Sequence, residues 1–134
     1  MQIAISADIH LRGKKETPER WGALKNLLDQ VGADDIEHLI IAGDLFDAKT
    51  HNFSGFDRLC KQKKYAGIDL HIIPGNHDAA LKQANFTADN IHIYEEPTPK
   101  KIGGKEFFFV PYLEDKGMGS VLAENTESLS QPWI

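Results

Sequence analysis

The sequence predicts an α/β fold in which three parallel strands, joined by helices, are followed by a β-hairpin. Three short apolar segments, at residues 3–7, 38–42 and 70–73, are typical of buried strands. Amphipathic helical segments lie between them, which favours a βαβαβ arrangement with right-handed crossovers and a parallel sheet. Further along the chain, Gly103 and Gly104 separate two strand-like segments and indicate a tight hairpin turn.

The first helix is predicted to start at Pro18, because Thr17 is a favoured N-cap residue and proline is favoured at the first helical position. Gly32 is expected to end this helix. A second amphipathic helix is expected from residue 53 to near Gly67. The apolar face of the first helix comprises Trp21, Leu24, Leu27, Leu28 and Val31.

The last third of the chain is predicted to form strands and one short helix. Residues 91–94 alternate as a strand does, and residues 107–110 are apolar enough to lie inside a sheet. A short helix is expected around residues 121–127. Residues 132–134 have the character of the opening of a further strand.

Length and composition predict one soluble globular domain over residues 1–134. No apolar run approaches the ~20 residues that span a bilayer, so we expect no membrane segment. The N-terminus lacks the basic region and cleavage site of a signal peptide. Cys60 is the only cysteine, which argues against a disulfide framework and favours a reducing, cytoplasmic setting.

The net charge of -5 argues against a simple nucleic-acid-binding module, which usually carries a broad excess of basic side chains. The charge is nevertheless partly sorted. Arg12, Lys14, Lys15 and Arg20 lie close together in sequence and are candidates for a local basic rim. A second basic cluster, within residues 58–64, is more typical of a solvated helix face.

Polar, metal-capable side chains directly follow each of the three predicted parallel strands. The carboxyl ends of parallel strands lie along one edge of a sheet, so we expect these side chains to converge there. Carboxylate, imidazole and amide oxygen ligands suit Mn, Fe or Zn, and two such metals can clamp the oxygens of an in-line phosphoryl displacement. The three motifs are Asp8-Ile9-His10, Gly43-Asp44-Leu45-Phe46-Asp47 and Gly75-Asn76-His77-Asp78.

Each motif alone has an ordinary explanation. Short Asp-x-His sequences occur in common loops, and a Gly-Asp pair is a common strand-to-loop turn. The segment 75–78 is more specific, because it places three polar groups directly after a buried strand. Their occurrence together at three successive strand ends favours a metal site over coincidental turns.

These motifs resemble the first three motifs of the calcineurin-like metallophosphoesterases, and the resemblance covers nearly the whole chain. It implies an αββα sandwich with two mixed sheets between helices. It also implies two divalent metals, with Mn favoured over Fe or Zn. Asp8 and His10 would hold the first metal, Asp44 would bridge both metals, and Asn76 would hold the second.

The same resemblance implies other roles for the remaining motif residues. His77 would contact the phosphate and protonate the leaving oxygen, with Asp78 orienting it. Asp47 would support the loop around Asp44.

Within that family, residues 6–11 and 42–47 are most similar to the SbcD-type DNA repair exonucleases, which act with an SMC-like ATPase partner. The resemblance therefore implies a metal-dependent nuclease or phosphodiesterase with nucleic acid as substrate. Arg12 follows the first metal loop and is a candidate substrate contact. A phosphatase acting on a small molecule or a phosphoprotein is an alternative. A non-catalytic scaffold of the same fold is another, against which the intact His77 argues.

Two later family motifs, a Gly-His and a Gly-His-x-His, do not occur in this sequence. We therefore expect the domain to be incomplete at its C-terminal end and inactive by itself. An uncovered sheet edge or apolar face would favour self-association, for example as a homodimer. His51 lies just past the second motif and is either a substrate contact or a plain loop histidine.

Overall fold

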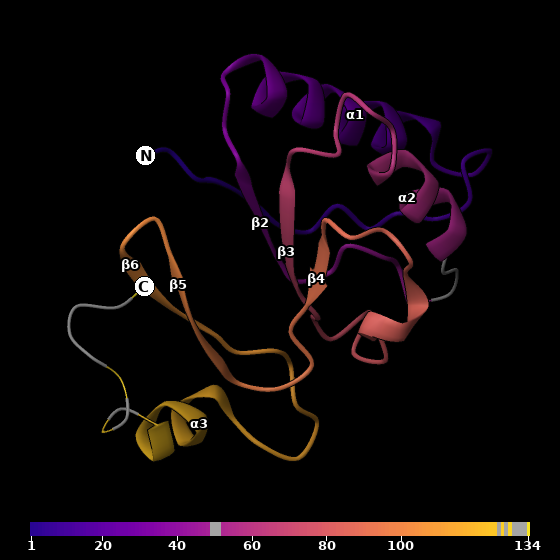
Figure 1. Cartoon of the computed structure of the whole chain (residues 1–134). Coiled ribbons are helices and arrows are strands. Elements are labelled where there is room, and N and C mark those ends of the chain that lie inside the picture. Colours follow the sequence, from indigo (N-terminus) through magenta and orange to yellow (C-terminus); the bar gives the residue numbers. More distant parts are fainter. Residues whose placement is uncertain (49–51, 126, 128, 130–133) are drawn as a thin grey trace.

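The structure, a computed structural model, describes residues 1–48, 52–125, 127, 129 and 134. A four-stranded parallel sheet, ordered β1-β2-β3-β4, lies at its centre (Figure 1). Its strands are β1 (Ala4–Ser6), β2 (His38–Ala42), β3 (Asp69–Ile73) and β4 (Ile91–Ile93). The first two crossovers contain α1 (Pro18–Ala33) and α2 (Phe53–Cys60), and the third contains a short 3-10 turn, η1 (Gln83–Asn85). The predicted parallel βαβαβ unit is thus confirmed, with β4 as a fourth parallel strand.

An antiparallel hairpin follows the parallel sheet, as predicted. Strands β5 (Thr98–Ile102) and β6 (Lys105–Phe109) pair around a two-residue turn. Gly103 and Gly104 have φ of 56° and 77°, the positive values that a tight hairpin turn of this kind requires. Helix α3 (Met118–Asn125) comes next, starting three residues earlier than expected. The backbone of Ile134 exchanges two hydrogen bonds with β6, as a neighbouring strand would, whereas residues 132 and 133 lie outside the described residues.

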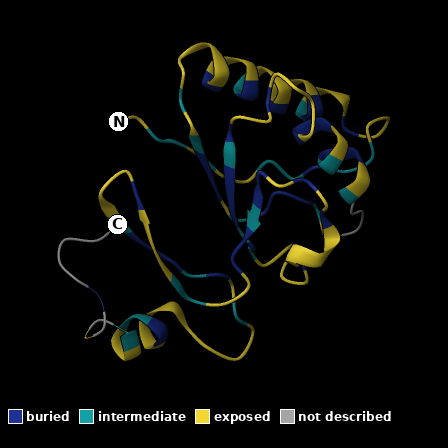
Figure 2. Cartoon of the chain, in the orientation of Figure 1, coloured by how far each residue is buried: buried dark blue, intermediate teal, exposed yellow. Residues whose placement is uncertain are grey.

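Alternation along the strands divides the core into layers. In β2, Leu39 and Ile41 pack toward α1 and α2, whereas Ile40 packs against the hairpin. In β6, Phe107 and Phe109 face the parallel sheet, and Phe108 packs on the other side with residues of the α3 region. The result is a helix–sheet–sheet–helix order, with the buried residues between the layers (Figure 2).

The second helix is shorter than the sequence predicts. It ends at Cys60, and tight turns carry the chain from there to β3 instead of a helix reaching Gly67. The cause is buried Asn90, whose side-chain amide donates hydrogen bonds to the carbonyl oxygens of Cys60, Tyr65 and Ile68. These carbonyl groups are satisfied by a residue far along the chain, so the backbone does not need to remain helical. No helix in the described part of the chain is long and apolar enough to cross a membrane.

A buried histidine lies between the parallel sheet and the hairpin. His71 is 3% exposed, with Nε2 3.1 Å from Nδ1 of His38 and Nδ1 2.7 Å from the hydroxyl oxygen of Tyr94. Its ring also stacks with those of His92 and Phe109. Burial, together with the neighbouring His92 and His38, lowers the pKa of His71 from 6.5 to about 4.

This depressed pKa predicts a pH-dependent stability. Unfolding returns the pKa of His71 to its ordinary value, so the neutral ring stabilises the fold fully above pH 6.5, and this contribution is lost as the pH falls toward 4. We expect the loss attributable to His71 to be roughly 2–3 kcal/mol. Urea unfolding at pH 7 and pH 4.5 measures it. In His71→Gln the loss should shrink by that amount. An unchanged pH dependence in His71→Gln would contradict the assignment.

Candidate metal centre

The loops that follow β1 and β2 are joined by backbone hydrogen bonds beyond the ends of the strands. The N–H groups of Asp8 and His10 donate to the carbonyl oxygens of Gly43 and Asp44, at 3.1 and 2.9 Å. Leu11 and Phe46 then form an isolated parallel bridge. The first two predicted motifs are therefore fixed against each other at one edge of the sheet.

Backbone strain is concentrated in these two loops. Asp8, His10 and Asp44 have positive φ values of 55°, 52° and 52°, in the left-handed region that costs an L-residue roughly 1–2 kcal/mol. The other non-glycine residue of this kind in the described chain is Asp35, far from the site in the turn after α1. Strain of this sort persists where surrounding contacts enforce it, and it is typical of functional sites.

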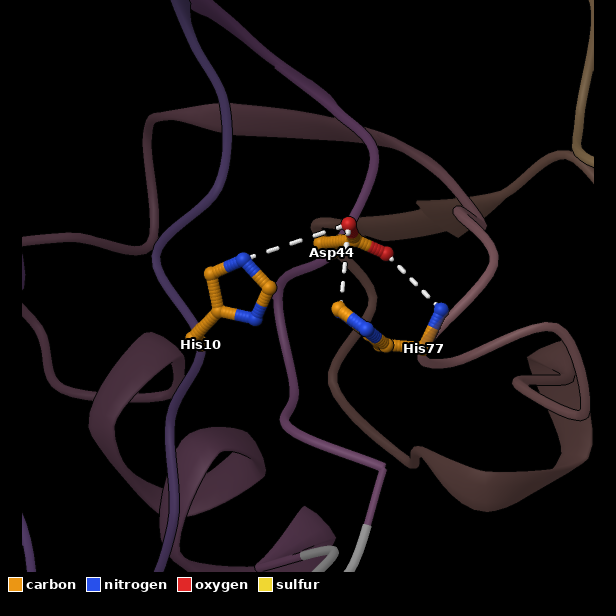
Figure 3. Close-up of side chains that lie close together, drawn as sticks. All are labelled: His10, Asp44 and His77. Atoms are coloured by element: carbon orange, nitrogen blue, oxygen red, sulfur yellow. Dashed lines mark hydrogen bonds and ion pairs between the residues drawn. The ribbon is translucent and has the colours of Figure 1, made fainter.

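Asp44 lies at the centre of the cluster (Figure 3). It is 9% exposed, and its Oδ1 accepts a hydrogen bond of 3.0 Å from the backbone N–H of His77. Its Oδ2 lies 3.4 Å from Nδ1 of His77 and 3.9 Å from Nε2 of His10. The same His10 nitrogen lies 3.9 Å from Oδ1 of Asp8. Residues from all three motifs thus meet around one carboxylate, as the sequence predicted.

Gly75 allows this close approach. A Cβ at position 75 would overlap Oδ1 of Asp44 and lie 2.6 Å from its backbone nitrogen. A strand-to-loop turn explains Gly43, which has a φ of 90°. Gly75 instead has an ordinary φ and is required because the Asp44 carboxylate occupies the space of its side chain.

Asp78 is buried beside the cluster and holds its loops. Its side chain is 2% exposed, with Oδ1 accepting a hydrogen bond from the N–H of Gly75 and Oδ2 from that of Phe46, at 2.7 and 3.1 Å. Burial raises the pKa of Asp78, against the opposing effect of these hydrogen bonds, and the charge of Asp44 raises it further. The carboxylate beside the His77 ring is that of Asp44, whereas the Asp78 carboxylate binds the backbone of the loops.

Asp47, predicted to support the loop around Asp44, forms an ion pair with Arg12, the candidate substrate contact. Nε of Arg12 lies 3.2 Å from Oδ2 of Asp47, and the N–H of Asp47 donates to the carbonyl oxygen of Leu11. Asp47 therefore fixes the loop after β1 as well as its own. The third candidate, His51, lies outside the described residues.

Helix α1 also holds the loop that carries His10. Nη1 of Arg20 donates a hydrogen bond of 2.7 Å to the carbonyl oxygen of His10, and Nε1 of Trp21 donates one of 2.8 Å to that of Arg12. The Thr17 hydroxyl accepts from the N–H of Arg12 rather than capping the helix. The sequence predicted Arg20 only as part of a basic rim, because Arg12, Lys14 and Lys15 lie near it in the chain.

A cleft opens beside the cluster, with a volume of about 460 Å³. Its polar end contains Asp8, Asp44 and the exposed Asn76, so Asn76 faces the same space as the two carboxylates. The opposite wall is apolar and comes from β6, the following loop and α3. Its lining residues are Phe108, Val110, Tyr112, Met118 and Leu122.

The donor set fits a divalent metal. Ligand atoms of His10, Asp44 and His77 all lie within 4.8 Å of one another, and carboxylate with imidazole is a combination that Mn, Fe and Zn accept. The strained loops and the close approach of Gly75 hold these atoms together beside the cleft. His77 lies close enough to be a ligand, whereas the family resemblance implies a role on the substrate.

The fold and this cluster match the domain that the three sequence motifs implied. The chain belongs to the calcineurin-like phosphoesterase family, whose model matches residues 1–132. This agrees with the resemblance carried by the three motifs.

Similar proteins include an exonuclease subunit, a metallophosphoesterase and a DNA polymerase subunit. Exonuclease subunit 1 of Enterobacteria phage T4 is 27% identical over 91% of this chain and 41% of its own length. An uncharacterised metallophosphoesterase of Bacillus subtilis, YhaO, is 26% identical over 77% of this chain and 29% of its own length. The DNA polymerase II small subunit of Halobacterium salinarum is 25% identical over 59% of this chain and 18% of its own length. The chain thus spans less than half the length of these relatives.

Gly75→Ala should weaken metal binding. The added methyl group would displace the Asp44 carboxylate from between the two histidines, so we expect the Mn affinity of the full-length protein to fall ~10–100-fold. Gly67→Ala is the matched control. Gly67 lies just before β3, as Gly75 lies just after it, and a Cβ at position 67 would meet nothing within 4 Å. Isothermal titration with Mn compares the two variants. Wild-type affinity in Gly75→Ala would refute the close-approach argument.

Arg20→Ala should weaken metal binding without removing a ligand. Losing the bond to the His10 carbonyl releases a strained residue, so we expect about a tenfold loss of Mn affinity, partly restored in Arg20→Lys. Arg58→Ala, which removes an exposed charge in α2, is the control. Similar Mn affinities for Arg20→Ala and Arg58→Ala would show that the helix contact does not position His10.

Proposed function

We propose that this chain forms the metal-binding part of a Mn-dependent phosphodiesterase that cleaves DNA as an exonuclease in repair or recombination. The observation that carries the proposal is the convergence of residues from three strand ends on Asp44, at the polar end of the cleft. Membership of the phosphoesterase family supplies the reaction class. The similarity to an exonuclease subunit supports the choice of substrate.

In this proposal Asp8 and His10 hold one metal, Asn76 holds a second, and Asp44 contacts both. Divalent metals in such a site neutralise charge on the phosphate oxygens and lower the pKa of a water molecule. The strained backbone at Asp8, His10 and Asp44 keeps the donors in place before substrate binds, so the reaction does not have to order them. Fe or Zn in place of Mn would use the same donors.

His77 is proposed to protonate the leaving oxygen. Its side chain is 47% exposed, and its Nδ1 faces Asp44, which leaves Nε2 to hold the proton that is transferred. Asp78 holds the backbone of the same loop and so fixes the position of the imidazole ring. A general acid of this kind contributes typically 10²–10⁴-fold to the rate.

Nucleic acid as substrate is supported by the basic segment next to the first metal loop. Arg12 is half-buried against Asp47, whereas Lys14 and Lys15 are exposed, with Nζ of Lys14 5.4 Å from the centre of the Trp21 ring. These charges are available to a phosphate backbone despite the acidic net charge of the chain. The phage relative is named as a subunit, which supports a partner protein for this chain, and we propose an SMC-like ATPase as that partner. We also propose that the chain can form a homodimer.

Two substitutions in the full-length protein separate the proposed roles. If His77 is a general acid, His77→Asn should leave bound Mn nearly unchanged while cleavage of linear DNA falls ~10²–10⁴-fold. Asp44→Ala should lose metal and activity together. Metal content by elemental analysis and the cleavage rate are measured on the same samples.

The results for the two variants and for the wild type distinguish the proposed function from its alternatives. Equal metal loss in both variants would show that His77 is a ligand. A wild-type protein that binds Mn and hydrolyses a phosphomonoester but not DNA would favour the phosphatase alternative. Mn binding without turnover of any phosphate ester would favour a non-catalytic scaffold.

A further inference from the structure

The cleft beside the metal cluster has an apolar wall that the phosphate chemistry does not use. Two of its side chains are large and exposed, with Tyr112 46% and Met118 60% accessible to solvent. Both line the same cleft as Asp8, Asp44 and Asn76. Carboxylates and an amide therefore share with an aromatic ring and a thioether one space of about 460 Å³, which lies within the usual range for ligand pockets.

Tyr112 is attached to the loop that bears the site residues. Its N–H donates a hydrogen bond of 2.9 Å to the carbonyl oxygen of Pro74, two residues before Asn76. It follows Pro111, which is buried and restricts the backbone at this point. The position of the Tyr112 backbone relative to the metal cluster is thus fixed. Its ring contacts no other aromatic ring in the described part of the chain.

On the basis of the proposed phosphodiesterase function, we propose that Tyr112 and Met118 form a nucleobase subsite. Tyr112 stacks on the base of the nucleotide whose phosphate lies at the Asp44 cluster. A nucleotide joins an anionic phosphate to a flat, apolar base, which matches the polar end and the apolar wall of this cleft. Met118 adapts to bases of different outline, because its side chain is flexible and polarisable.

This subsite defines the form of nucleic acid that the cleft accepts. A base inside a duplex is already stacked on its neighbours and cannot offer its face to Tyr112. The preferred substrate is therefore a single strand or an unpaired end. Every base has a π-face, so the subsite tolerates any sequence.

Binding of small ligands tests the subsite without depending on cleavage. The Mn-loaded full-length protein is titrated with deoxyadenosine 5′-monophosphate and with deoxyribose 5-phosphate, which lacks the base. We expect the nucleotide to bind about tenfold more tightly than the sugar phosphate. Tyr112→Ala should abolish this difference, and Tyr112→Phe should keep it. Lys116→Ala is the matched control, because Lys116 is exposed in the same loop but does not line this cleft.

Equal affinities for the two ligands in the wild type would overturn the subsite, as would a preference for the nucleotide that survives in Tyr112→Ala. Melting temperatures of the variants show that they fold, which we expect because Tyr112 is exposed. The proposed function is tested separately by DNA cleavage. A protein that prefers the nucleotide but cleaves no DNA retains the subsite and loses the nuclease proposal.

Discussion

The position of the Asp44 carboxylate is the constraint on which the site depends. It is 9% exposed, and one oxygen accepts the N–H of His77 while the other faces two imidazole rings. A second buried carboxylate, Asp78, lies close enough that the charge of Asp44 raises its pKa. Two acidic groups at one buried edge are costly unless cations compensate them. Hydrogen bonds from backbone N–H groups offset part of this cost for both carboxylates, and a cation at the Asp44 oxygens would offset more.

The sequence predicted the elements whose signals are local. Strand β2 coincides with its apolar run, and the glycine pair at the hairpin has the backbone geometry that its residue type indicates. The sequence did not predict where α2 ends, because that boundary depends on Asn90, thirty residues downstream of Cys60. The sequence predicted that the three motifs lie at one sheet edge, because each motif directly follows a parallel strand. It missed the reason for Gly75, since only the folded chain brings Asp44 against it.

The layers of the fold contribute different chemistry to one cleft. The carboxyl edge of the parallel sheet supplies the charged and metal-capable residues, whereas β6 and α3 supply an apolar wall. These two parts are joined directly by the hydrogen bond between Tyr112 and Pro74. A substrate with both an anionic and a flat apolar part would contact both layers, which gives the second layer a role in recognition besides covering the core.

Helix α1 belongs to the site as much as to the core. Its apolar face packs on the sheet through Trp21 and Leu24, while the Trp21 indole and the Arg20 guanidinium hold the carbonyl groups of the loop that carries His10. Each left-handed residue in that loop costs roughly 1–2 kcal/mol, so the loop needs external contacts to remain ordered. The same side chain, Trp21, thus contributes burial energy to the fold and geometry to the metal centre. A substitution that loosens α1 should therefore weaken metal binding before it unfolds the protein.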